Sequence, residues 1–435
     1  TSKPPTRSLS PEKATSNLWE RQMAKLLEIT GKAISGEWGQ DDDTGTGIPV
    51  LRTTNFTNEG FVNYKNVVTR SISKKNIAEK YLRHGDVIIE KSGGSDKQPV
   101  GRVIFFEGEE NKYLFNNFTG LLRVQNPEEW LPKYVFYALY AYYRNGGTRA
   151  FENRTTGLHN LQVDNYVKSV DIPKLSYRKQ QHICETLDHV RAAVAYREQQ
   201  LTKLDELVKA RFVEMFGDML LNSLEWPEKP LEGLADIVSG ITKGRKTTET
   251  GLIEVPYMAV SNVKSGYIDW TTIKTILATK QEIEQYRLMP DDILMTEGGD
   301  PDKVGRGAII KNPLKDSIHQ NHIFRVRLDK SELLPAYFAE YLQHQKAKRY
   351  FLGCAKQTTG IASINMRQLR ALPVLIPPLP LQNQFADFVA KVDKSKLFVG
   401  SAAAHKPFDI GFFSQKHCAT PCKRGIISSK HMIFH

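Results

Sequence analysis

The feature that most constrains this chain is an internal repeat with a period of slightly more than 200 residues. Eight segments recur in the same order at a nearly constant offset. The first members begin at Trp19, Ile48, Gly85, Val100, Leu121, Leu131, Thr155 and Ile172, and their counterparts begin at Trp226, Val255, Asp291, Val304, Ile323, Leu334, Thr358 and Ile376. Such an ordered series indicates a duplication. It predicts two similar folded units rather than one large core.

Each copy combines strand and helix patterns. Short β-branched and aromatic runs bounded by glycine or proline, such as the run that begins at Asp86, are typical of strands. The aromatic stretches 134–143 and 337–350 favour helices, with Pro132 and Pro335 near their starts. We therefore predict the α/β class for both copies.

A long helix is predicted between the copies, because residues 178–216 contain neither glycine nor proline. At 1.5 Å per residue this helix would be about 58 Å long. Such a length is too great to bury an apolar seam against one small domain, so we expect a partner helix. The alternative is a linker helix packed only on its neighbours. Apolar residues recur every three or four positions, with one polar break near Arg197, at Ile183, Leu187, Val190, Val194, Leu201, Leu204 and Val208.

The second copy begins an equivalent helix near Gln382, with Phe385, Phe388 (or Val389) and Val392 as its apolar stripe. After Leu397 the periodicity stops, and glycines and prolines punctuate the rest of the chain. This pattern predicts a shortened distal helix followed by an atypical basic tail.

The net charge of +12 suits a polyanionic partner, but its distribution weakens that argument. Residues 394–435 hold seven Lys or Arg against one acid, Asp409, so the body of the chain is only mildly basic. Four scattered cysteines argue against a disulfide-stapled secreted fold. Neither a membrane-spanning apolar run nor a signal peptide is evident, so we expect a cytoplasmic protein without membrane contact.

Two repeats, each followed by a helix, resemble the layout of the specificity subunits of type I restriction-modification systems. The motifs that carry the resemblance begin at His319 (His-Gln-Asn-His-Ile-Phe-Arg-Val), Thr358 (Thr-Thr-Gly-Ile) and Ile376 (Ile-Pro-Pro-Leu-Pro-Leu-Gln-Asn-Gln-Phe), and the similarity covers 18–396. The resemblance implies two α/β target-recognition domains, each reading one half of a split site in double-stranded DNA. It also implies that the long helices form an antiparallel coiled coil, which docks two methyltransferase subunits, with restriction subunits completing the complex.

On this basis the chain divides into six expected parts. They are a disordered N-terminal segment (1–17), target-recognition domain 1 (18–172), a central spacer helix (173–217), target-recognition domain 2 (218–375), a shortened distal helix (376–397) and the atypical basic tail (398–435).

Candidate DNA contacts follow from charge and from the glycine-rich loops, where backbone can approach phosphate and arginine can reach guanine. For Arg102 and Arg306, which recur in both copies, the alternative is a role in holding the strand or turn. For the lone lysines the alternative is a solvated surface. The candidates are Lys91, Lys97 and Arg102 in the first copy, and Lys243, Arg245, Lys246, Lys303 and Arg306 in the second.

We find no catalytic set and predict neither a cofactor nor a metal. The Asn/Asp-Pro-Pro-aromatic loop of an amino-group methyltransferase is absent, and Arg245 breaks the phosphate-loop pattern that begins at Gly240. Asp86 and Glu90 hint at a nuclease, but Thr296 stands at the position that matches Glu90, which favours a plain turn and strand.

One further alternative for the tail is a zinc site, for which a replaced terminus is the competing explanation. Its candidate ligands are Cys418, Cys422, His431 and His435.

The sequence therefore predicts a non-catalytic specificity subunit, which reads a bipartite, asymmetric DNA site and directs methyltransferase and restriction subunits. One alternative is the recognition portion of a single-chain restriction-methyltransferase, which the methionine-less start leaves open. An in-frame upstream catalytic domain would favour that fusion. Another is a scaffold that does not bind DNA, and salt-sensitive duplex binding would argue against it.

Overall fold

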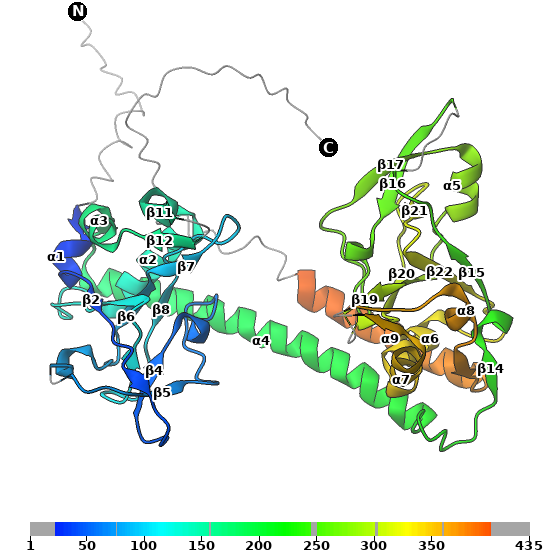
Figure 1. The fold of residues 1–435 in the computed structure, drawn as a ribbon, viewed down its shortest axis with the longest axis horizontal. Helices are drawn as coiled ribbons and strands as arrows, with labels where there is room; N and C mark the ends of the chain where they lie inside the picture. The colour runs from blue at the N-terminus through cyan, green and yellow to red at the C-terminus, as the bar shows by residue number, and fades with distance from the viewer. Residues whose placement is uncertain are drawn as a thin grey trace, which may run out of the picture. The chain divides into compact units, whose positions relative to one another are not determined.

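The computed structural model describes residues 22–74, 76–155, 158–244, 250–300, 303–358 and 361–401. Contacts divide them into a first unit that ends at Ala193 and a second that begins at Val194 (Figure 1). Arg245, Lys246, the predicted disordered segment 1–17 and the four candidate zinc ligands lie outside the described residues. No helix in the described ranges is long and apolar enough to cross a membrane.

The first unit contains three sheets and one strand pair. Their strand orders are β2-β10-β6-β8, β3-β5-β4-β9, β11-β12-β7 and β1-β13. The strands are β1 (Met23–Lys25), β2 (Ile34–Ser35), β3 (Gln40–Asp41), β4 (Ile48–Leu51), β5 (Val68–Ser71), β6 (Val87–Glu90), β7 (Ser92–Gly94), β8 (Val103–Phe105), β9 (Leu114–Phe115), β10 (Thr119–Leu122), β11 (Glu152–Thr155), β12 (Leu158–Leu161) and β13 (Asp171–Pro173).

The second unit repeats this topology. Its strand orders are β15-β22-β18-β20, β17-β16-β21, β19-β24-β23 and β14-β25. The strands are β14 (Glu228–Pro230), β15 (Ala235–Ser239), β16 (Ile253–Met258), β17 (Lys274–Ala278), β18 (Asp292–Thr296), β19 (Gly298–Gly299), β20 (Gly307–Ile310), β21 (Ile318–His319), β22 (Ile323–Leu328), β23 (Lys356–Thr358), β24 (Ile361–Ser363) and β25 (Pro373–Leu375).

The helices complete two units of mixed α/β structure, which confirms the predicted class. The helices are α1 (Leu26–Thr30), α2 (Pro132–Arg144), α3 (Val163–Ser169), α4 (Tyr177–Phe216), α5 (Lys280–Tyr286), α6 (Pro335–Gln343), α7 (Gln345–Cys354), α8 (Met366–Arg370) and α9 (Leu379–Ser401). The stretch 337–350 was expected to be one helix. It is two, because His344 has an extended backbone between α6 and α7.

Two ion pairs, each with a buried aspartate, occupy equivalent places in the units. Asp86 accepts two hydrogen bonds from the guanidinium of Arg123, at 2.8 and 2.6 Å. Asp292 accepts two from Arg327, both at 2.8 Å. This two-point geometry is the strong form of an arginine–carboxylate pair, so both aspartates serve the framework.

Repeated asparagines also shape the loop that follows the strands β4 and β16. Asn55 accepts a hydrogen bond from the backbone of Arg52 at 3.0 Å and donates to the carbonyl of Asn63 at 3.0 Å. Asn262 accepts from Ala259 at 2.9 Å and donates to Asp269 at 2.8 Å. The asparagine in both copies is thus explained by the backbone groups that it satisfies.

The long helix α4 confirms the helix predicted between the copies. Its first part packs on the first unit through Cys184, Ile183 and Leu187, while Val208 and Phe212 pack in the core of the second unit. Val190 and Val194, between these regions, are 41% and 42% exposed. The apolar seam predicted from the sequence is therefore buried at both ends and open in the middle.

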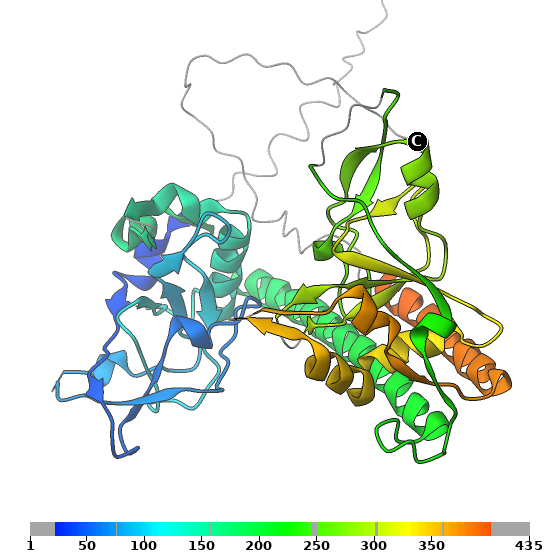
Figure 2. The same cartoon turned by 45° about the vertical axis from the view of Figure 1, so that its right-hand side comes forward.

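Within the second unit, α9 runs antiparallel to α4 (Figures 1 and 2). The ring of Phe212 lies 5.4 Å from the ring of Phe385, centroid to centroid. Nearer the start of α4, Asp205 pairs with Lys396 at 2.5 Å. Earlier residues of α4 thus contact later residues of α9, which confirms the predicted antiparallel pairing.

A buried glutamine near the start of each long helix fixes that helix to its own unit. Gln180 accepts a hydrogen bond from the N–H of Leu131 at 2.8 Å and donates to the carbonyl of Glu129 at 2.9 Å. Gln382 accepts from Leu334 at 2.8 Å and donates to Glu332 at 3.0 Å. Both amides cap the helix start at α2 or α6, where backbone N–H groups have no partner within the helix.

Candidate nucleic-acid interface

The predicted DNA contacts of each copy flank a short glycine strand, β7 in the first unit and β19 in the second. Each glycine strand pairs with the second strand of a hairpin, β12 or β24. Gly94 on β7 packs so tightly that a Cβ there would lie 2.6 Å from the nitrogen of Val100. A side chain larger than glycine would collide with Val100, so Gly94 allows β7 to approach the segment that leads to β8.

The repeated Val-Gly-Arg motif follows the same loop. Gly101 has φ +101°, and a Cβ would lie 2.7 Å from the side chain of Thr148. Gly305 has φ +68°, and a Cβ would overlap the ring of Phe351. Both glycines occupy a backbone region that other residues rarely adopt, in a place with no room for a side chain. They thereby fix the backbone position of the arginine that follows, Arg102 or Arg306.

Lys91 and Lys97 lie at opposite ends of the β7 loop. The ammonium of Lys91 is 3.4 Å from the hydroxyl of Ser35. Burial lowers the pKa of Lys91, and the neighbouring Lys80 lowers it further. Lys97 is exposed on the loop that leads to β8. Of the two, Lys97 is the more accessible to a partner.

Arg102 is surrounded by protein acceptors. Its guanidinium donates to the carbonyls of Phe56 and Thr53 at 3.0 and 2.9 Å, and it pairs with Glu90 at 3.3 Å. Burial raises the pKa of Glu90, while Arg102 acts in the opposite direction. In this arrangement Arg102 ties the strand β8 to the loop that follows β4.

The corresponding residues of the second unit are arranged differently. Lys303 pairs with Asp300, and Lys243 is exposed on the loop that follows β15. Arg306 is half-buried and, within the described residues, makes neither an ion pair nor a side-chain hydrogen bond. The two arginines of the repeated motif therefore have different surroundings despite their matching positions.

Sequence reasoning missed one pair of exposed positions beside the glycine strands. The N–H of Lys91 donates to the carbonyl of Phe118 at 2.8 Å, and that of Glu297 donates to His322 at 3.0 Å. Phe118 is 55% exposed, and the side chain of His322 is 56% exposed. Aligning the two copies offered a signal, because an aromatic residue matches an imidazole immediately before the equivalent strands β10 and β22.

The described residues contain no group of three or more His, Cys, Asp or Glu placed to hold a metal ion. The carboxylates that hinted at nuclease chemistry are engaged elsewhere, Asp86 by Arg123 and Glu90 by Arg102. The site offers charge and hydrogen-bond donors for recognition.

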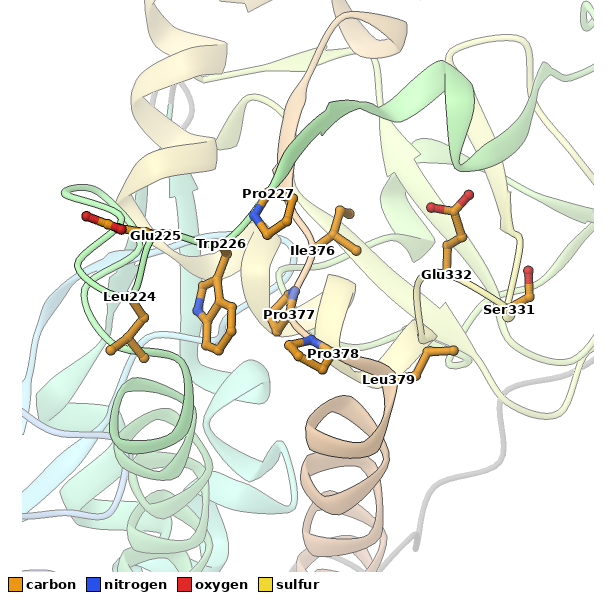
Figure 3. Close-up of a pocket in the computed structure, with 10 residues that line it drawn as sticks. All are labelled: Leu224, Glu225, Trp226, Pro227, Ser331, Glu332, Ile376, Pro377, Pro378 and Leu379. Atoms are coloured by element: carbon orange, nitrogen blue, oxygen red, sulfur yellow. The ribbon is translucent and has the colours of Figure 1, made fainter.

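An apolar groove of about 460 Å³ opens elsewhere in the second unit, between the end of α4 and the start of α9 (Figure 3). Trp226, Pro377 and Pro378 line its wall, and Glu332 lies at one end. The indole N–H of Trp226 donates to the carbonyl of Phe216 at 3.0 Å, which caps the last turn of α4. None of the predicted DNA contacts lines this groove.

Comparison with solved structures supports the fold. The type I restriction-modification S subunit from M. genitalium superimposes with a TM-score of 0.50 at 15% identity, over 89% of this chain and 93% of that one. At this identity the likeness concerns the fold alone: a two-domain protein of the S-subunit type.

Comparison of sequences finds a matching domain model and similar proteins. Residues 223–398 match the model of the type I restriction modification DNA specificity domain. The putative type I restriction enzyme MjaX specificity subunit of Methanocaldococcus jannaschii is 28% identical over 171 residues, which span 39% of this chain and 40% of that protein. The EcoKI specificity subunit of Escherichia coli is 24% identical over 366 residues, which span 80% and 75%. Over most of its length the chain is therefore similar to specificity subunits of type I restriction-modification systems, and residues 223–398 match the domain model of that family.

Proposed function

We propose that this protein is the non-catalytic, DNA-reading subunit of a type I restriction-modification complex. The observation that carries the proposal is a shared framework with different exposed residues. Framework pairs such as Asp86–Arg123 and Asp292–Arg327 repeat in both units. Residues beside the glycine strands differ, as with Lys91 and Glu297. A duplicated reader needs a constant scaffold and variable contacts, and this chain has both.

Two readers of different surface chemistry suit a split, asymmetric DNA site. Each unit would contact one half-site, with lysine and arginine on phosphates and base edges. If the connection between the two recognition units has a fixed length, that length determines the spacing between the half-sites, as in other two-part DNA-binding proteins. In this proposal residues 18–172 and 218–375 are the recognition domains, and the accessible candidates Lys97, Lys243 and Lys303 are DNA contacts.

The proposed complex places all catalysis in partner subunits. Two methyltransferase subunits would dock on the long helices, whose pairing within the second unit gives them a rigid support, and restriction subunits would join that core. S-adenosylmethionine and ATP would bind to those partners, so this chain needs no cofactor of its own. We infer that the complex works in the cytoplasm, where the DNA is.

A genome-wide map of adenine methylation, made with the gene present and deleted, tests this function. We expect a bipartite, asymmetric motif that disappears on deletion and returns when the intact gene is restored. The control is deletion of the methyltransferase gene, which should remove the same motif. A motif that persists after deletion of this gene, but not after deletion of the methyltransferase gene, would contradict the proposal.

A further inference from the structure

The final residues of β6 and β18 occupy equivalent places, each opposite the arginine of the Val-Gly-Arg motif. The N–H of Glu90 donates to the carbonyl of Arg102 at 2.8 Å. The N–H of Thr296 donates to the carbonyl of Arg306 at 3.0 Å. The two units thus share the same backbone hydrogen bond at this place. They differ in the side chain, which is Glu90 in the first unit and Thr296 in the second.

In the first unit this side chain is a carboxylate, and it holds the arginine inside the protein. Glu90 and Arg102 have side-chain exposures of only 6% and 14%. The carbonyls of Phe56 and Thr53 accept further hydrogen bonds from its two terminal nitrogens, and its Nε is buried without an acceptor among the described residues. Releasing Arg102 would leave a buried carboxylate without its partner, which is strongly unfavourable. Arg102 is therefore a structural residue.

In the second unit the side chain is a hydroxyl, and the arginine forms no ion pair with any of the described residues. Val260 and Val263 stand where Thr53 and Phe56 stand in the first unit, and the guanidinium of Arg306 bonds to neither. The hydroxyl of Thr296 is itself buried and has no hydrogen-bond partner within the described part of the chain. A guanidinium stays charged at any physiological pH, and the buried Nε–H of Arg306 has no acceptor among the described protein groups.

The described acids near Arg306 make their close contacts with other residues. Asp300 influences it electrostatically, but Asp300 pairs with Lys303. Glu297 pairs with His322 at 2.6 Å. Among the described residues, Arg306 therefore forms no ion pair with either of these carboxylates beside the glycine strand β19.

We propose that Arg306 contacts the acceptor oxygens or nitrogens of DNA, and that the residue at position 90 or 296 decides whether the neighbouring arginine serves the fold or the ligand. This inference rests on the proposed function. Thr296 leaves Arg306 available, whereas Glu90 retains Arg102. The second unit accordingly has an arginine contact that the first unit lacks.

The test measures binding of the full chain, assembled with its methyltransferase subunits, to a duplex carrying the methylated motif, over a series of salt concentrations. Arg306→Ala should weaken binding about tenfold and reduce the slope of log K against log salt by about one if the contact is a phosphate. A base contact would instead relax discrimination at one position of the motif. Either result supports the inference.

Thr296→Glu is the sharper variant, because it recreates the pair that Glu90 makes with Arg102. It should weaken DNA binding as much as Arg306→Ala while leaving the melting temperature unchanged or higher. The double variant should bind no worse than either single variant, since both remove one contact. Arg102→Ala is the matched control, and it should lower the melting temperature of the first unit.

The outcomes separate this inference from the function on which it rests. If the wild-type complex binds the duplex and both Arg306→Ala and Thr296→Glu bind equally well, the assignment of Arg306 is wrong and the specificity role stands. If the wild-type complex shows no binding to the motif duplex, the proposed function fails, and this inference fails with it.

Discussion

At the scale of single residues, one buried position is a polar histidine in the second copy and an apolar phenylalanine in the first. His319 is fully buried on β21, in the place that Phe115 occupies on β9. Its ring nitrogens lie 3.3 Å from the carbonyls of Tyr286 and Val238. Burial lowers the pKa of His319 to about 4.

This histidine predicts acid sensitivity. Below pH 6.5 the unfolded chain takes up a proton at His319, while the folded chain does not until about pH 4. The unfolded state then binds more protons, so stability falls as the pH drops from 6.5 to 4. The loss should reach about 3 kcal/mol at pH 4. Urea unfolding at several pH values between 7.5 and 4.5 measures this change in the free energy of unfolding of the second unit.

The variant His319→Phe restores the residue found in the first unit and provides the control. It should flatten the pH dependence of the second unit in this range, whatever its effect on stability at pH 7.5. An unchanged slope in the variant would show that other groups cause the acid loss.

At the scale of elements, the two long helices are oriented by a buried amide rather than by their apolar seams alone. Gln382 satisfies the N–H of Leu334 and donates to the carbonyls of Glu332 and Pro377. These links join the start of α9 to the start of α6. In both copies the glutamine follows the Ile-Pro segment that begins at Ile172 or Ile376. Its hydrogen bonds fix the direction of the start of each long helix relative to its own unit.

Removing the side-chain amide of Gln382 should lower the stability of the second unit. Gln382→Ala leaves an N–H and two carbonyls without their partner, so we expect a loss of about 2 to 4 kcal/mol in the free energy of unfolding of the second unit. Chemical denaturation measures the loss. Gln384→Ala, at an exposed position two residues further along the same helix, should change stability by less than about 0.5 kcal/mol. Equal effects of the two variants would argue against the anchoring role.

At the scale of the whole molecule, each hydrophobic cluster in the described residues draws its members from one unit. The large cluster of the second unit includes Phe212, Phe216, Tyr337 and Phe385, and that of the first includes Tyr134 and Tyr137. Separate cores predict separate unfolding transitions, because multidomain chains seldom unfold in a single step.

Phe212→Ala tests this division. The side chain is 1% exposed, and its ring lies 5.4 Å from that of Tyr337. Its removal should lower the stability of the second unit by about 3 to 5 kcal/mol through lost contacts and the cavity left behind. Calorimetry should show one transition shifted and the other in place. Two transitions that shift together would contradict independent cores.

Sequence alone determined the features that depend on local pattern or on comparison of the copies. It determined the duplication, the α/β class and the helix α4, because these follow from periodicity and from glycine and proline placement. It also singled out the Val-Gly-Arg motif, because the motif recurs in both copies. These properties need no knowledge of distant contacts.

Tertiary structure decided what depends on partners far apart in the chain. Arg102 meets Thr53, Phe56 and Glu90 only after folding, so its sequence could not distinguish it from Arg306. The same holds for Val190, whose place in the apolar seam predicted burial although no neighbour covers it in the described residues. Helix periodicity states which side chains share a face. Which of those faces is covered, and which charges are matched, depends on the packing of distant segments.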